Sequence, residues 1–238
     1  MTRFVHQGNN KRIFIRRMFA DIAGRYDLLN RIISLGLDRR WRRRLAKAMA
    51  PDAGDRFLDL ACGTGDQAIE LLRIQPGCQV LAADPVTGML SIARQKQPHL
   101  PVLACESETL PFPDACFSGV TITFGIRNFS FLSLGLREVI RVIEPGGRLG
   151  ILEFARPSSG FLASAAGWYV NTVIPFIGRL LAGSAAYNYL PESIDVFPAP
   201  DRIMAKLKNW GLVDVRARSM LAGLVILYLG KKAPLNTD

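Results

Sequence analysis

Apolar positions at helical spacing dominate the first fifty residues. Phe14, Met18, Ile22 and Tyr26 lie four residues apart, as neighbours on one face of a helix do. A second series follows, and its members are Trp41, Leu45 and Met49. We therefore predict helices over residues 13–50, with Asp38 as the N-cap of the second helix and a loose polar tail over residues 1–12.

Beyond residue 55 the pattern changes to short apolar runs separated by helical stretches. The runs predict five strands, over residues 56–61, 79–84, 101–105, 117–123 and 148–154. The intervening stretches predict helices over residues 66–73, 87–97 and 132–143. This alternation implies right-handed crossovers and a parallel sheet with helices on both faces. After a helix near residues 199–210, runs at 213–219 and 223–229 predict an antiparallel hairpin at one edge, which brings the sheet to seven strands.

The segment between Arg156 and Arg179 carries no charged residue, and its length is close to that of a bilayer span. Serines, glycines, Asn171 and Pro175 interrupt it, and such residues disfavour a continuous helix in lipid. We therefore expect two short apolar helices here and not a membrane span.

Composition narrows the class of protein. With 49% hydrophobic and 21% charged residues, the 238-residue chain can bury a core, which excludes a disordered or collagen-like protein. Thirty basic and 20 acidic side chains give a net charge of +10, which favours anionic partners. The four cysteines lack metal-ligand or redox spacing, so we expect reduced thiols in a cytoplasmic chain. His6 and His99 are the only histidines, which argues against a histidine-centred triad or a zinc site.

A turn rich in glycine follows the first predicted strand and opens the next helix. It reads DLACGTGD over residues 59–66, and Asp84 ends the second predicted strand, 19 residues after Gly65. An acidic residue at this spacing is placed to accept hydrogen bonds from ribose hydroxyls, and the glycines admit a ligand close to the backbone. The same glycine spacing satisfies the permissive dinucleotide fingerprint. Asp59 favours a cofactor with a cationic amino group over one with a pyrophosphate.

These residues lead to a resemblance. Asp59-x-Ala61-x-Gly63-x-Gly65 resembles the first motif of class I S-adenosylmethionine-dependent methyltransferases, with Ala61 for the usual first glycine. From about Phe19 to Gly230 the chain is similar to the ubiquinone/menaquinone biosynthesis C-methyltransferase family. The stretches that carry this likeness are Phe19-x-x-Ile22-Ala23-x-x-Tyr26-Asp27-x-x-Asn30, Ser34-x-Gly36-x-x-Arg39-x-Trp41, Leu110-Pro111-Phe112-Pro113, Thr123-Phe124-Gly125-Ile126-Arg127-Asn128, the Arg141–Leu149 segment and Tyr187-x-Tyr189-Leu190-Pro191-Glu192-Ser193-Ile194.

The resemblance implies an α/β, Rossmann-like class I methyltransferase fold: a mostly parallel seven-stranded sheet, an antiparallel C-terminal hairpin and helices on both faces. Residues 1–50 would form an N-terminal helical extension or lid. Residues 51–238 would form the cofactor-binding domain, with a helical insertion at about 157–195 after the fifth strand. The implied methyl donor is S-adenosylmethionine, and no metal is implied.

Family roles carry over to ten positions as cofactor-binding residues. They are Asp59, Ala61, Gly63, Thr64, Gly65, Asp84, Met89, Glu106, Ser107 and Thr123. In the class, the acidic residue corresponding to Asp84 holds the ribose, and the apolar residue that follows it packs on adenine. Glu106 and Ser107 depart from the family pattern, which has Asp or Asn followed by Ala. Thr123 stands where the family often has Ser, and its hydroxyl keeps the option of a hydrogen bond.

The implied reaction is methyl transfer to a ring carbon of a prenylated quinol. Such a carbon becomes electron-rich when the neighbouring hydroxyl ionises, so a base or a cation near that oxygen is needed. Arg127 and Asn128 follow the fourth predicted strand, at the edge where parallel sheets bind ligands. We expect Arg127 to stabilise a phenolate or activate a water and Asn128 to orient the ring oxygen, with Tyr187 a third catalytic candidate on resemblance alone. The alternatives are a structural ion pair for Arg127 and ordinary packing for Tyr187.

Two other segments suggest where the substrate comes from. The apolar stretch over 161–187 either lines a groove for the prenyl tail or packs as a pair of lid helices. A basic run on the second predicted helix either docks on an anionic membrane surface or forms a solvated helix face, and it comprises Arg39, Arg40, Arg42, Arg43 and Arg44. We expect a cytoplasmic protein, peripheral at the inner face of the membrane, whose oligomeric state the sequence leaves open.

Other functions remain as alternatives. A nucleic-acid methyltransferase would suit the net charge, but the Asn/Asp-Pro-Pro-aromatic motif is absent after the fourth predicted strand, so no nucleic-acid partner is expected. A nicotinamide oxidoreductase would suit the glycine spacing but lacks a proton relay. A non-catalytic scaffold that binds the cofactor is the third alternative, supported by the departure at Glu106 and Ser107. The sequence does not choose between a naphthoquinol of menaquinone biosynthesis, slightly preferred, and a benzoquinol of ubiquinone biosynthesis.

Overall fold

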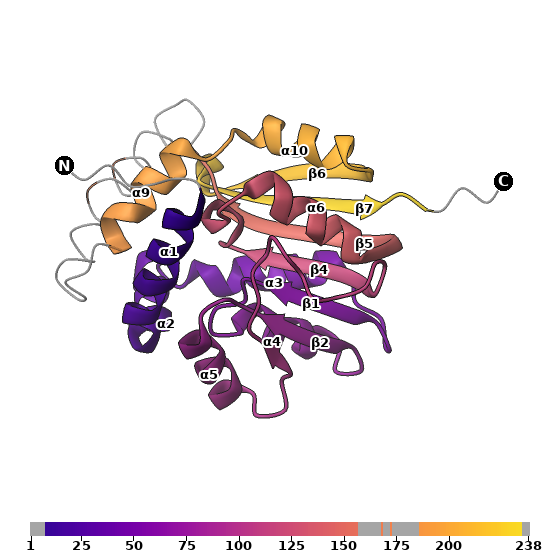
Figure 1. Cartoon of the computed structure of the whole chain (residues 1–238), viewed down its shortest axis with the longest axis horizontal. Helices are drawn as coiled ribbons and strands as arrows, with labels where there is room; N and C mark the ends of the chain where they lie inside the picture. Colours follow the sequence, from indigo (N-terminus) through magenta and orange to yellow (C-terminus); the bar gives the residue numbers. More distant parts are fainter. Residues whose placement is uncertain (1–7, 157–167, 169–171, 173–185, 235–238) are drawn as a thin grey trace.

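The computed structural model describes residues 8–156, 168, 172 and 186–234. One seven-stranded sheet runs through its centre, in the order β3-β2-β1-β4-β5-β7-β6 (Figure 1). The strands are β1 (Arg56–Leu60), β2 (Gln79–Ala83), β3 (Val102–Leu103), β4 (Phe117–Thr123), β5 (Ile143–Phe154), β6 (Leu212–Met220) and β7 (Val225–Lys232). The first five pair in parallel, and β7 pairs antiparallel with both β5 and β6. The predicted mostly parallel sheet with a C-terminal hairpin is confirmed.

Helices cover both faces of the sheet because alternate strand residues point to opposite sides. Phe57 and Leu58 are both fully buried, yet they belong to different core clusters. The cluster containing Phe57 includes side chains of α3 (Leu37–Met49), α4 (Asp66–Ile74) and α5 (Thr87–Lys96). The cluster containing Leu58 includes side chains of α6 (Leu132–Val142) and α10 (Pro200–Asn209).

The N-terminal helices start earlier than predicted. Helix α1 spans Gly8–Ile22, so residues 8–12 are helical and not a loose tail. A 3-10 turn over Ala23–Arg25 joins α1 to α2 (Tyr26–Ile33). The prediction that Asp38 caps the next helix is wrong: Gly36, with a φ of 75°, is the N-cap of α3, and the Asp38 carboxylate instead accepts a 2.9 Å hydrogen bond from the Ser34 hydroxyl.

Two strands differ in length from their predictions. Strand β3 has only two residues, because it pairs with β2 only at Ala82 and Ala83. Strand β5 begins at Ile143, so it includes the Pro-Gly-Gly turn, and its pairing with β4 shifts register between Phe117 and Gly119. After β5, helix α9 (Ala186–Val196) precedes α10, and most of the predicted insertion lies outside the described residues. Within the described ranges, no helix is long and apolar enough to cross a bilayer.

Candidate functional site

The glycine turn sits at the carboxyl end of β1 and bends through left-handed backbone conformations. Ala61, Gly63 and Gly65 have φ values of 53°, 55° and 81°. Gly65 is the N-cap of α4, and a Cβ there would lie 2.9 Å from the Cβ of Ala93. Only glycine combines a left-handed backbone conformation with such a close approach to a neighbouring side chain without strain. The turn therefore holds its backbone open to a ligand at the start of a helix.

Asp84 at the end of β2 faces this turn. One carboxylate oxygen accepts a 2.9 Å hydrogen bond from the backbone N–H of Gly63, and the other accepts one of the same length from Val86. The side chain is buried, and burial raises the pKa of Asp84 to about 6 despite these bonds. The two fixed bonds orient the carboxylate while leaving lone pairs for a ligand.

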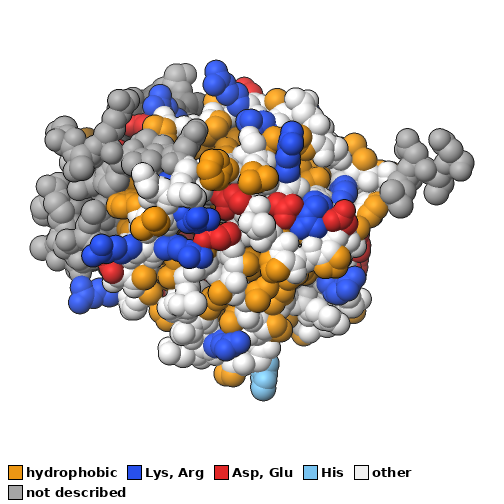
Figure 2. Space-filling model, viewed as in Figure 1, with side chains coloured by type: hydrophobic (Ala, Val, Ile, Leu, Met, Phe, Trp, Pro, Cys, Tyr) orange, Lys and Arg blue, Asp and Glu red, His pale blue; other side chains and the backbone are white. Residues whose placement is uncertain are grey.

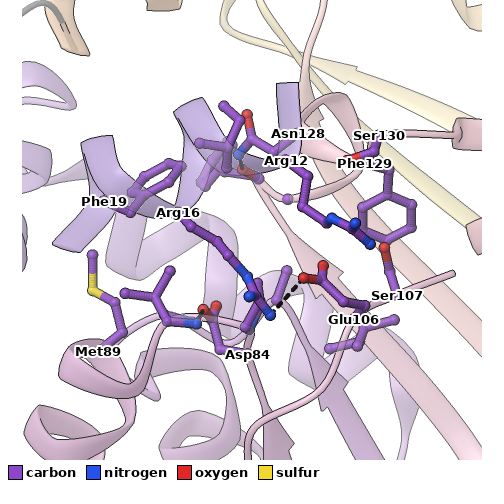
Figure 3. Close-up of a pocket in the computed structure, with 18 of the residues that line it drawn as sticks. Arg12, Arg16, Phe19, Asp84, Met89, Glu106, Ser107, Asn128, Phe129 and Ser130 are labelled. Carbon is purple, nitrogen blue, oxygen red and sulfur yellow. Dashed lines mark hydrogen bonds and ion pairs between the residues drawn. The ribbon is translucent and has the colours of Figure 1, made fainter. Parts of the chain in front are cut away.

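A cavity lies over the carboxyl ends of β1, β2 and β4, and it encloses about 700 Å³, including space open to solvent. Many of the predicted cofactor residues line it: Ala61, Gly63, Asp84, Met89, Glu106, Ser107 and Thr123. Figure 3 shows Arg16 of α1 reaching down between Asp84 and Glu106. Its guanidinium lies 2.6 Å from the Glu106 carboxylate, so an ion pair spans the cavity. Figure 2 shows acidic side chains near the middle of this face and basic ones beside them.

Three predicted cofactor residues do not line this cavity, and each supports the turn from behind. The fully buried Asp59 carboxylate accepts hydrogen bonds from the Ala68 N–H at 3.0 Å and the Thr121 hydroxyl at 2.9 Å. Burial raises the pKa of Asp59 to about 7. Thr64 and Gly65 complete this group, and Thr64 donates a 2.6 Å hydrogen bond to the Asp27 carboxylate.

Lys96 connects this support to the N-terminal helices. Its ammonium lies 2.5 Å from the Asp27 carboxylate and 2.6 Å from that of Asp66, and it donates a 2.9 Å hydrogen bond to the Thr64 hydroxyl. Asp27 belongs to α2, Asp66 to α4 and Lys96 to α5. Lys11 makes a second connection, between α1 and the segment after β4. Its buried ammonium donates hydrogen bonds to the backbone carbonyls of Arg127 and Phe129 at 2.7 and 2.8 Å.

A second cavity, of about 740 Å³ including space open to solvent, adjoins the first on the side of α2 and α3. The two share Phe19, Tyr26 and Phe124 as lining residues. The second is largely apolar, and its other lining residues are Met18, Ile22, Leu29, Asn30, Ile33, Ser34, Asp38, Trp41, Arg42, Arg127, Phe154, Tyr189 and Leu190. Phe124, whose φ is 57°, therefore forms part of the wall between the two.

Arg127 lines the second cavity, but its charge is already paired. One guanidinium nitrogen lies 2.5 Å from the carboxylate of Glu153, a fully buried residue on β5, and donates to the Phe124 carbonyl at 2.9 Å. The Arg127 backbone N–H donates to the other Glu153 oxygen at 3.2 Å. The ion pair that was the alternative for Arg127 is therefore present.

Asn128 lines the first cavity and meets a tyrosine at its border with the second. The Tyr189 hydroxyl donates a 3.2 Å hydrogen bond to the Asn128 side-chain oxygen. Burial raises the pKa of Tyr189 to about 12, so the phenol stays protonated at neutral pH. The predicted Tyr187 lies in α9, but its side chain is outside the described residues.

The basic run on α3 divides between two faces. Arg39, Arg40, Arg43 and Arg44 are exposed, whereas Arg42 is only 7% exposed and faces the second cavity. The prediction that all five form one outward face is wrong at Arg42. Buried positions on α3 follow the 3.6-residue period through Asp38, Trp41, Arg42 and Leu45, and this period could have revealed it.

The sheet order, the glycine turn and Asp84 over the strand ends have the arrangement of class I S-adenosylmethionine-dependent methyltransferases. A family model described as "ubiE/COQ5 methyltransferase family" matches residues 5–232 of this chain. The chain therefore belongs to that family.

Relatives and solved structures extend the comparison. A demethylmenaquinone methyltransferase of Thermus thermophilus is 43% identical over 90% of this chain and all of the relative. The ubiquinone/menaquinone biosynthesis C-methyltransferase UbiE of Geobacter sulfurreducens is 42% identical, over 92% of this chain and 88% of its own. A methyltransferase structure from Thermotoga maritima, described as a possible histamine N-methyltransferase, shares the fold at 18% identity with a TM-score of 0.66, over 91% of this chain and 98% of its own.

The [4+2]-cyclase SpnF shares the fold as well, with a TM-score of 0.68 at 15% identity, over 98% of this chain and all of its own. A cyclase and a methyltransferase on one fold show that the architecture does not fix the reaction. The chemistry must therefore be argued from the side chains of the two cavities.

Sequence reasoning missed several residues of these cavities. Tyr189 was not assigned a role, Asp38 was predicted only as a helix cap, and Arg42 was placed on the surface. Glu153, the ion-pair partner of Arg127, was not assigned a role either. Arg16 and Phe129 of the first cavity were also missed. Tyr189 stood within a family stretch, so resemblance gave one signal for it, whereas Glu153 had none beyond its place at the end of an apolar strand.

Proposed function

We propose that this protein transfers a methyl group from S-adenosylmethionine to a ring carbon of a prenylated quinol. Demethylmenaquinol is the preferred acceptor, and a benzoquinol of ubiquinone biosynthesis is the second candidate. The observation that carries the proposal is the pair of adjoining cavities that share Phe19, Tyr26 and Phe124, with the glycine turn and Asp84 at the first and Arg127 at the second. The names of the relatives support a quinol as the acceptor.

The chemistry of the first cavity fits S-adenosylmethionine. The oriented Asp84 carboxylate would accept from the ribose hydroxyls, Met89 would pack on adenine and Glu106 would accept from the adenine amino group. Ala61, Gly63, Ser107 and Thr123 complete the proposed contacts. When bound, the cofactor supplies an electrophilic methyl group on a sulfonium.

The residues behind the cavity would act on the cofactor through the turn. Asp59, Thr64 and Gly65 fix the backbone that the methionine moiety would meet. The extension over residues 1–50 would act as a lid, because α1 and α2 contribute lining residues to both cavities. Such a lid excludes water from the methyl group and holds the acceptor near it.

The second cavity would receive the quinol ring. Asn128 stands where the cavities meet and would orient a ring oxygen, assisted by the Tyr189 hydroxyl. Arg127 would place hydrogen-bond donors beside that oxygen, with its net charge balanced by Glu153. Tyr187 remains a candidate by resemblance. Apolar side chains over 161–187 would extend the cavity for the prenyl tail.

A methyl-transfer assay tests the proposal. Purified protein, S-adenosylmethionine and reduced demethylmenaquinone in detergent should yield product one methyl group heavier. Asp84→Ala should weaken cofactor binding by about 100-fold, because hydrogen bonds from two ribose hydroxyls to a charged acceptor are lost. Calorimetry gives the affinity, and mass spectrometry gives the product.

The controls separate the alternatives. Cofactor binding without product, with either the naphthoquinol or a benzoquinol, would contradict the proposed reaction and favour a scaffold. Because the pKa of Asp84 is raised to about 6, wild-type affinity should also fall as pH is lowered from 7 to 5, where the carboxyl becomes protonated. Asp84→Asn should abolish this dependence.

The exposed face of α3 is proposed to contact an anionic membrane, where a prenylated substrate resides. It carries Arg39, Arg40, Arg43 and Arg44, and each basic residue near such a surface contributes about 1 kcal/mol. Replacing all four by Gln should reduce sedimentation with phosphatidylglycerol vesicles by at least tenfold. Binding to phosphatidylcholine vesicles should be weak for both proteins. Equal sedimentation of the variant and the wild type would contradict the contact.

A further inference from the structure

Arg42 differs from every other arginine of the run on α3. Its neighbours Arg43 and Arg44 point to solvent, whereas Arg42 is 7% exposed. It stands one helical turn after Asp38, which is equally buried, and both line the second cavity. Two charged side chains of one helix therefore face a largely apolar space.

The Arg42 guanidinium makes no ion pair within the described part of the chain, and its Nε has no hydrogen-bond partner there. Among the described residues its ring contact is with Phe124, whose centre lies 5.8 Å from the guanidinium carbon. Its positive charge helps to lower the pKa of Asp66 and opposes the burial that raises the pKa of Asp59, but neither carboxylate lies within ion-pair distance of it. A buried cation without a counter-ion is costly, so the site is suited to an anion.

Arg127 offers a contrast in the same cavity. Glu153 balances the charge of Arg127, so an added oxyanion there would leave a net negative charge. No carboxylate pairs with Arg42 among the residues described. Among the described residues Asp38 accepts a hydrogen bond from the Ser34 hydroxyl at 2.9 Å, which leaves acceptor lone pairs on its carboxylate for a substrate hydroxyl.

We propose that Arg42 is the counter-ion of the acceptor's ring oxygen and that Asp38 is the base that ionises it. The assignment rests on the proposed function. The quinol hydroxyl gives its proton to the Asp38 carboxylate, and the oxyanion is held by the Arg42 guanidinium. The neighbouring ring carbon then forms a bond to the methyl group while the sulfonium sulfur keeps the electron pair of the broken bond. Loss of the ring proton to water restores the aromatic ring as an oxyanion, and the Asp38 carboxyl then returns its proton to that oxygen, which regenerates the quinol and the free carboxylate.

Several other ionisable groups surround this pair. From α2, α9 and the loop after β4, those that line the cavity are Tyr26, Tyr189 and Arg127. Asp59 and Asp66 are not among the lining residues of this cavity, but the charge of Arg42 interacts with both carboxylates. These groups are common to the wild type and the variants below, so a change confined to one variant reports on the substituted residue.

Three variants test the pair. Arg42→Met removes the charge at similar length, Arg42→Lys keeps a charge without the guanidinium, and Asp38→Asn removes the base. Lys47→Met is the matched control, because Lys47 is an exposed cation on the same helix. Turnover is measured in detergent, and calorimetric binding of S-adenosylmethionine verifies that each variant is folded.

Arg42→Met and Asp38→Asn should each lower kcat by about 100-fold, with cofactor affinity kept. The loss should shrink as pH rises and the acceptor ionises in solution, whereas a loss caused by misfolding would be the same at every pH. Arg42→Lys should retain more activity than Arg42→Met. Lys47→Met should match the wild type.

Titration of a bound nitronaphthol, whose neutral and ionised forms absorb at different wavelengths, gives a second readout. Arg42→Met should raise the pKa of the bound probe by about 1–3 units, and Lys47→Met should not. An unchanged probe pKa, with near wild-type kcat, would overturn the assignment while the proposed function stands. If the wild type methylates no quinol, the proposed function fails, and the probe titration still decides whether Arg42 holds an oxyanion.

Discussion

Replacing Glu153 by Met lowers the free energy of unfolding by about 3–5 kcal/mol, because it leaves the guanidinium of Arg127 buried without its counter-ion. The Glu153 carboxylate accepts from the Arg127 guanidinium, from the Arg127 backbone N–H and from the Phe154 N–H. Met has a similar volume, so the loss is electrostatic and not that of a cavity. For a chain of this size the midpoint of thermal unfolding should fall by roughly 10 °C.

The double variant distinguishes an ion-pair effect from damage to β5. Arg127→Met together with Glu153→Met removes both charges, and such pairs can be replaced by apolar side chains at little cost. The double variant should therefore recover most of the stability lost in Glu153→Met, as measured by urea unfolding. If the losses of the two single variants simply add, the two charges are not coupled and the assignment of Arg127 as a paired residue is wrong.

The strands were predictable because their signal is local. The central parallel strands β1 and β4 are buried on both faces, so each appears in the sequence as a short, mostly apolar run between helical stretches. The boundaries of the strands were harder to predict than their existence. The length of β3 depends on how far its neighbour pairs with it, and the Pro-Gly-Gly sequence suggested a turn where β5 continues through an irregular register.

The lining of the first cavity was also largely predictable. Gly63 and Asp84 belong to short motifs whose spacing has a physical reason, and the structure brings them into hydrogen-bond contact. The surroundings of the second cavity were not predictable. The pairing of Arg127 with Glu153 joins the turn after β4 to β5 across 26 residues of sequence, and no local pattern indicates which carboxylate a given arginine will contact.

Arg42 shows a different kind of failure. The periodicity of Trp41, Leu45 and Met49 identified the buried face of α3, and Arg42 lies on that same face. From the sequence, Arg42 was placed on the exposed face because its neighbours along the chain are charged. Its position on the helix, one turn after Asp38, was not considered. In a helix whose apolar face is known, a charged residue on that face is a candidate for function before it is a candidate for the surface.

The free energy of unfolding should fall as pH rises from about 4 to 7, which is opposite to the trend in proteins whose carboxylates are stabilised by folding. Burial raises the pKa of Asp59 to about 7 and that of Asp84 to about 6, above the value of about 3.9 for an unfolded aspartate. Between these values the folded state binds more protons than the unfolded state. Stability therefore falls with pH by up to about 1.4 kcal/mol per unit for each proton.

Asp59 should account for the larger part of this dependence, with an upper limit of about 4 kcal/mol over three pH units. Asp59→Asn keeps the side chain's shape without its charge, so its stability should vary less with pH and should exceed that of the wild type near pH 7.5. Urea unfolding at several pH values, without cofactor, gives both curves. If the free energy of unfolding varied with pH in the same way for both proteins, Asp59 would already be ionised near pH 4. Its hydrogen bonds from Ala68 and Thr121 would then outweigh the cost of burying the charge.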